Sequence, residues 1–192
     1  MRTDQWLLFG HLVGVIVLFG AVAVENISLI AILRARTTQD LRAATTFTPL
    51  LPRMFPAAVV LLLAFGVGLV AHSDEFKFGE AWIDLGFGVL ILLAVIGPTV
   101  HGRRIDRIRT EARTAPDGPV PVELMTRVQD PVMRTSALVS TWLAIGIVLL
   151  MTRQPDWAGA WIVVVVFGLI GLSESMMLSR LGAAASDGPS LR

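Results

Sequence analysis

Two ionisable side chains lie inside the first long apolar stretch of the chain, residues 6–33. They are His11 and Glu25, which are 14 residues apart. On an α-helix this spacing brings them within roughly 40° of one another, on one face. Ionisable groups are costly inside membrane helices and usually face protein or water. This face is therefore predicted to point into a helix bundle. It also carries Gly14, which with Gly10 forms a small-residue pair suited to close helix contact.

A possible cofactor site combines His11 with polar residues of the next two apolar stretches. His72 ends the second stretch, and Asp84 lies near the start of the third. Imidazole binds haem iron, copper and zinc, and two histidines on neighbouring helices can hold a haem axially. We predict b-type haem binding by His11 and His72, or binding of copper or another divalent metal by His11, His72 and Asp84. In the alternative, His72 lies at the membrane–water interface without binding a ligand, and Asp84 serves only to interact favourably with the helix dipole at the start of its helix.

A second polar group lies nearer the other end of the spans. Glu25 lies 19 residues into the first stretch and Glu174 lies 17 residues into the last, so their depths match if both run in the same direction. With Asn26 they are predicted to form a proton or ion relay. Two buried carboxyls cannot both be charged without a nearby cation, so we expect one to be protonated or an arginine to reach between them. The alternative is that each carboxylate reaches water or pairs separately with an arginine. The candidate arginines are Arg103, Arg104 and Arg134.

The composition defines the class of protein. The chain has 192 residues, of which 54% are hydrophobic and 16% charged, which is too apolar for a soluble domain of this length. It contains no cysteine, which excludes disulfides, thiolate metal sites and iron–sulfur clusters. No phosphate-binding glycine loop, zinc-protease motif or nucleophile elbow is present. Residues 1–181 are predicted to form a single membrane domain, followed by a disordered tail over 182–192.

Five apolar stretches are long enough to cross a bilayer as helices. We predict an all-α, five-helix transmembrane bundle, with a long loop at 102–133 between the third and fourth helices. The predicted spans are about 6–33, 54–72, 81–101, 134–151 and 157–179.

Several local signals place the ends and bends of these helices. Thr38 is predicted to cap a short helix after the first span, and Pro56 to lie in the first turn of the second. A kink is expected at Gly97–Pro98, just before His101 at the end of the third span. The segment 103–109 is expected to continue that helix. A short amphipathic helix is predicted at Val122–Gln129, with Pro131 separating it from the fourth span.

The distribution of basic residues predicts the orientation. Thirteen of the sixteen Lys and Arg residues lie in 34–53, in 102–134 or after the last span, all on one side of the predicted bundle. Only Arg2, Lys77 and Arg153 lie on the other side. The positive-inside rule therefore predicts an external N-terminus and a cytoplasmic C-terminus.

Four motifs within residues 5–156 form a recognisable pattern. They are Phe9-Gly-His-Leu-Val-Gly14, Gly79-Glu-Ala-Trp-Ile-Asp-Leu-Gly86, Ile96-Gly-Pro98 with Arg103-Arg104, and Met151-Thr-Arg-Gln-Pro155. Together they resemble an uncharacterised family of bacterial integral-membrane proteins, which is distantly similar to the copper-resistance D-type membrane proteins and to the bacterial membrane protoporphyrinogen oxidase. The resemblance implies a bacterial cytoplasmic-membrane location, and it places the oxidase's first-helix histidine, associated with haem b, at His11.

Three functional hypotheses follow. The first is a multi-pass bacterial cytoplasmic-membrane protein that binds haem b or a metal near its outer face, for electron transfer or a haem-linked oxidation. The second is a small proton- or cation-coupled transporter or channel subunit that uses Glu25 and Glu174. The third is a structural subunit of a larger membrane complex or a homo-oligomer. In each case the partner is the lipid bilayer, and nucleic acid is not expected.

Overall fold

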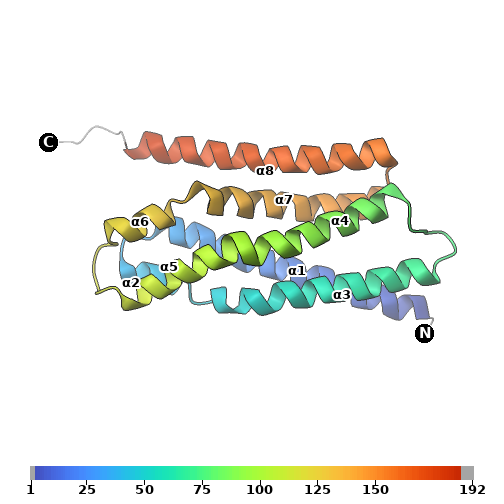
Figure 1. Ribbon diagram of the computed structural model, residues 1–192, viewed down its shortest axis with the longest axis horizontal. Helices are drawn as coiled ribbons and strands as arrows, with labels where there is room; N and C mark the ends of the chain where they lie inside the picture. Colours follow the sequence, from blue (N-terminus) through green and yellow to red (C-terminus); the bar gives the residue numbers. More distant parts are fainter. Residues whose placement is uncertain (1–2, 187–192) are drawn as a thin grey trace.

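Five long apolar helical segments run alongside one another through the protein (Figure 1). The computed structural model describes residues 3–186, and its regular elements in that range are helices. Each of the five segments is long and apolar enough to cross a bilayer, which confirms the predicted all-α, multi-pass membrane fold. The elements are α1 (Thr3–Arg34), α2 (Thr38–Ala44), the 3-10 turn η1 (Thr48–Leu50), α3 (Leu51–His72), α4 (Ala81–Ile96), the π-helix η2 (Gly97–Gly102), α5 (Arg103–Thr114), α6 (Val122–Val128), α7 (Pro131–Arg153) and α8 (Trp157–Ser186).

The long helices form two closely packed pairs that α4 joins. Helix α1 lies along α3, α7 lies along α8, and α4 contacts α3, α7 and α8. The predicted small-residue pair lies in the first of these contacts. A Cβ atom added at Gly10 would lie 2.5 Å from the ring of Phe65, and one at Gly14 would lie 3.0 Å from Leu62. The absence of side chains at these two glycines therefore permits the close approach of α1 and α3.

Large apolar side chains cover the outer surface of the bundle. Ile16 on α1 is 70% exposed, Val60 on α3 is 64% exposed and Ile162 on α8 is 61% exposed. Exposing so much apolar surface to water would cost free energy, whereas lipid chains are as apolar as these side chains. This surface of the bundle therefore contacts the lipid bilayer.

The two ends of the bundle differ (Figure 1). One end, which we call the short-loop end, carries the start of α1 and the connections α3–α4 and α7–α8. The other, the arginine-rich end, carries α2, α5 and α6. A buried apolar cluster that includes Ile32, Leu41, Ile108 and Met133 joins these three short helices to α1 and α7. The arginine-rich end is thus a packed layer with its own core.

This packing changes the predicted loop at 102–133 and the span that follows it. Helices α5 and α6 occupy most of the segment, and α5 continues from the third span as expected. Helix α7 begins at Pro131, so this proline starts the fourth span instead of separating it from α6. The carboxylate of Asp130 caps α7 by accepting a hydrogen bond from the Val132 N–H at 2.8 Å. Proline is favoured in a first turn because its missing N–H would have no intrahelical partner there.

Two other helix starts also differ from the predictions. Thr37, not Thr38, caps α2: its hydroxyl accepts from the Asp40 N–H, and the Asp40 carboxylate accepts from the Thr37 N–H. Thr38 is buried and donates to the carbonyl of Pro116 at 3.0 Å instead. Helix α3 begins at Leu51, so Pro56 lies inside the helix and not in its first turn. The sequence alone did not reveal that the turn before α3 continues directly into it.

The predicted kink at Gly97–Pro98 is a π-helical turn over residues 97–102. Pro98 cannot donate a backbone hydrogen bond, and π turns inside α-helices commonly mark functional positions. His101 lies in this turn and is buried. At the other end of the chain, α8 continues to Ser186, into the tail predicted from residue 182. The remainder of that predicted tail, 187–192, lies outside the described residues.

Candidate functional site

A cavity of about 770 Å³ opens among α1, α3, α4 and α7 near the short-loop end. We call it the outer cavity, because the positive-inside rule predicts that this end of the bundle faces outward. Its wall is mainly aliphatic and aromatic, and both His11 and His72 line it. Three carboxylates, Asp4, Asp74 and Glu75, also line it, and none of its described lining residues is Lys or Arg. Its size and apolar wall are those of a pocket for a small organic molecule.

Two polar side chains of α1 line this cavity, Asp4 and His11, and His11 lies further from the end of the helix. Its imidazole packs on α3, where a Cβ atom added at Gly66 would lie 3.4 Å from the His11 Nδ1 and Cε1 atoms. The Nδ1 atom is buried and has no hydrogen-bond partner among the described residues. A buried ring nitrogen without a partner is costly.

His72 and Asp84 have different surroundings. His72 is exposed, and its Nδ1 lies 3.0 Å from the Gly68 carbonyl oxygen. Because a carbonyl only accepts, Nδ1 carries the proton of this contact, which places the lone pair of the neutral ring on Nε2. Asp84 does not line the outer cavity, and its Oδ1 accepts from the Gly79 N–H at 3.3 Å. Within residues 3–186 no three His, Asp or Glu side chains are grouped as metal ligands. The cavity thus brings His11 and His72 together without Asp84.

The three residues of the predicted relay, Glu25, Asn26 and Glu174, each have a different partner. The Glu174 Oε2 accepts from the Trp142 Nε1–H of α7 at 2.6 Å. The adjacent residue of α7, Thr141, accepts at 2.9 Å from the Nδ2 amide of Asn26. Helix α7 therefore provides one partner to Asn26 of α1 and another to Glu174 of α8. Glu25 of α1 has its partner on a different element, the π-helix η2. Among the described ion pairs, none joins an arginine to Glu25 or Glu174.

The partner of Glu25 is His101. The Glu25 Oε1 lies 3.4 Å from the His101 Nε2, and the two side chains are only 4% and 3% exposed. The other ring nitrogen of His101, Nδ1, lies 3.3 Å from the Ser136 Oγ of α7. The π turn thus connects α1 to α7 through one imidazole. His101 was predicted to lie at the end of its span but was not among the predicted site residues. The Gly97–Pro98 pair just before it is the sequence signal that pointed to this position.

The Ser136 hydroxyl has two partners within hydrogen-bond distance. They are the Met133 carbonyl oxygen at 3.1 Å and the His101 Nδ1 at 3.3 Å, and the donor in the second contact depends on the tautomer of the imidazole. A carboxyl beside an imidazole can form a pair without net charge, either with both groups neutral or as carboxylate and imidazolium. Such pairing limits the cost of burying the two groups.

The fold and these two groups define a multi-pass, five-span membrane protein with an apolar cavity near one end and a buried acid–imidazole pair nearer the other. No protein-family model, curated protein or solved structure matches the chain.

Proposed function

We propose that this membrane protein binds b-type haem in the outer cavity, with His11 as the iron ligand. The observation that carries the proposal is the buried His11 Nδ1 atom, which has no partner among the described residues and belongs to a residue lining an apolar cavity of about 770 Å³. His72 lines the same cavity and keeps its Nε2 free, so it is the candidate second ligand. The resemblance carried by residues 5–156 supports the same role for His11.

The lining of the cavity favours haem over a metal ion alone. A bare copper or other divalent ion needs several polar ligands close together, and no three His, Asp or Glu side chains among the described residues are grouped in this way. Asp84, the third ligand of that prediction, does not line the cavity. The apolar wall suits a porphyrin ring, and a bound haem would supply one-electron redox chemistry. The cavity is lined by carboxylates, which would repel the haem propionates, and by no described Lys or Arg. The propionates would therefore lie in water outside the cavity.

Haem binding predicts a Soret band after haemin is added to the detergent-purified protein. The His11→Ala variant is expected to bind haemin at least about tenfold more weakly, a loss of about 1.4 kcal/mol. His72→Ala should have a smaller effect because His72 is exposed. His101→Gln is the matched control, since this third histidine does not line the cavity and glutamine can keep hydrogen bonds. A wild-type protein without a Soret band, or equal binding by wild type and His11→Ala, would refute the proposal.

We also propose that the short-loop end faces the outside of a bacterial cytoplasmic membrane, because most basic residues lie toward the other end. A fluorescent-protein fusion after Arg192 is then expected to fluoresce, and an alkaline phosphatase fusion at the same position to be inactive. The opposite pair of results would reverse the orientation and would place the haem site on the cytoplasmic side.

A second candidate function, a proton-coupled transporter or channel subunit, is favoured by the Glu25–His101 contact. The two side chains are buried within spans and their polar atoms lie 3.4 Å apart, and ionisable residues inside spans commonly mark proton pathways. In this form the candidate relay consists of Glu25, His101 and Ser136. Glu174, included in the sequence-based relay, is bonded to Trp142 and is not required.

A further inference from the structure

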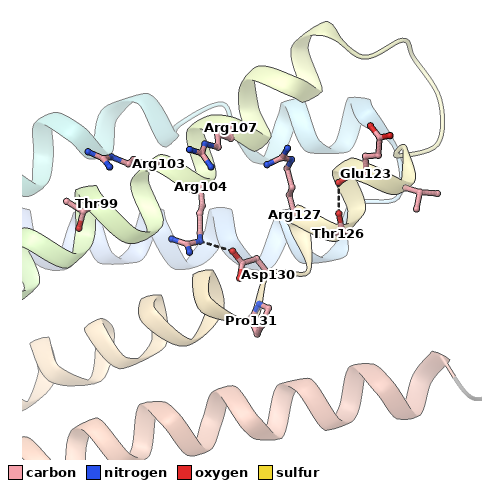
Figure 2. Close-up of a pocket in the computed structure, with 10 residues that line it drawn as sticks. Thr99, Arg103, Arg104, Arg107, Glu123, Thr126, Arg127, Asp130 and Pro131 are labelled. Atoms are coloured by element: carbon pink, nitrogen blue, oxygen red, sulfur yellow. Dashed lines mark hydrogen bonds and ion pairs between the residues drawn. The ribbon is translucent and has the colours of Figure 1, made fainter.

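A pocket of about 860 Å³ lies at the arginine-rich end, between the π turn, α5, α6 and the start of α7. Figure 2 shows the arginine side chains of α5 and α6 around it. Four arginines and two carboxylates line the pocket, which leaves a net charge of +2. The charged residues are Arg103, Arg104, Arg107, Arg127, Glu123 and Asp130.

Two of the four arginines already have carboxylate partners. The Arg104 Nε donates to the Asp130 Oδ2 at 2.7 Å, and the other oxygen of Asp130 caps α7 (Figure 2). The Arg127 Nε lies 3.1 Å from Glu111 Oε2, outside the pocket lining. Arg103 and Arg107 are exposed, and neither has an ion pair within residues 3–186.

The position of the two unpaired arginines favours a bound anion. Arg103 and Arg107 are four residues apart, so they are neighbours on one face of α5 and repel one another. A phosphate group between them would remove this repulsion and accept several charge-assisted hydrogen bonds, since guanidinium groups match phosphate geometry. The hydroxyls of Thr99 and Thr126 already donate to the backbone carbonyls of Val95 and Glu123, so the arginines would supply the donors.

The pocket lies at the ends of two membrane spans, next to the apolar surface that contacts lipid. Helix α5 continues directly from the third span, and Pro131 begins the fourth. Val122, which also lines the pocket, is 82% exposed, and Val132 beside Pro131 is 48% exposed. Arginines next to exposed apolar side chains at this depth can contact both the phosphate and the acyl chains of a lipid.

We infer that this arginine pocket binds a phosphate-bearing anion, through Arg103 and Arg107 with Arg104 and Arg127 beside them. An anionic phospholipid headgroup and a soluble phosphate compound share this chemistry. The apolar surroundings favour the lipid, which would be held as a specific partner of the arginine-rich end.

The experiment measures binding to the full-length protein in mild detergent. Native mass spectrometry follows retention of cardiolipin, phosphatidylglycerol and, as a zwitterionic comparison, phosphatidylcholine; calorimetry with inorganic pyrophosphate provides the soluble arm. We expect Arg103→Gln/Arg107→Gln to bind cardiolipin at least about tenfold more weakly, as expected for loss of charged hydrogen bonds. The matched control is Arg36→Gln/Arg113→Gln, which removes the same charge from two exposed arginines that do not line the pocket.

Selective loss of anionic-lipid binding in the pocket variant supports a lipid ligand, and selective loss of pyrophosphate binding supports a soluble one. The proposal is overturned if the wild type binds neither probe, or if both double variants lose binding equally. Should the double pocket variant be unstable, the two single variants replace it. Unchanged binding in both of them also overturns the proposal.

Discussion

Replacing Glu25 with alanine is expected to lower the free energy of unfolding by about 2–3 kcal/mol, toward the upper end of the usual cost of leaving a buried polar group without its partner. The variant leaves the His101 Nε2 buried without its carboxyl partner, in a side chain that is only 3% exposed. Water cannot replace the lost contact without opening the junction of α1, the π turn and α7. The measurement is equilibrium unfolding of the purified protein in mixed micelles.

Two substitutions serve as comparisons for Glu25→Ala. Glu25→Gln keeps an amide that can donate to His101 Nε2, so its loss should be about 1 kcal/mol. Glu174→Ala removes a carboxylate at similar depth from a half-buried position and loses a single hydrogen bond from Trp142, again about 1 kcal/mol. If Glu25→Ala is no more destabilising than Glu174→Ala, the Glu25–His101 pair does not stabilise this junction.

The Glu25→Gln variant also separates the two functional proposals. Glutamine cannot gain and lose a proton as a carboxyl does, so a proton-coupled transporter that uses Glu25 should lose proton uptake in proteoliposomes at nearly unchanged stability. Haem binding in the outer cavity does not involve Glu25, so the Soret band should remain. Retained proton uptake in this variant would remove the support that the buried pair gives to the transport proposal.

Gly171→Ala is expected to destabilise the contact between α7 and α8 by about 1–3 kcal/mol, and Gly171→Leu by more. A Cβ atom at Gly171 would lie 2.7 Å from the Cα and 3.0 Å from the backbone N of Val139. These are backbone atoms, which cannot move aside as a flexible side chain can. The substitution must therefore push α8 away from α7 along much of their shared length.

Gly168 provides the matched control on the same helix. A Cβ atom added there meets nothing within 4 Å. Gly168→Ala should therefore leave stability unchanged or raise it by up to about 1 kcal/mol, because alanine is the better helix former. Unfolding curves of the two alanine variants give the comparison. Equal stability of Gly171→Ala and Gly168→Ala would contradict the close backbone approach at Gly171.

The amino-acid sequence by itself determined the five spans and one helix contact. Spans depend on local composition, because each apolar stretch must be long enough to cross hydrocarbon whatever its neighbours are. A close helix contact at Gly10 and Gly14 could also be predicted, since small residues at this spacing permit close packing, but only the structure identifies α3 as the partner. His11 was selected for a comparable reason: an imidazole inside a span is costly wherever the helix lies.

Only the tertiary structure decided which polar groups meet. Matching depth suggested a Glu25–Glu174 pair, but depth does not specify which helix lies beside which, and α7 provides Trp142 to Glu174. The π turn of residues 97–102 contains His101, which contacts Glu25, and this contact depends on the packing of α1 against that turn. Such pairs depend on distances between residues far apart in the chain, which helical periodicity and hydropathy do not contain.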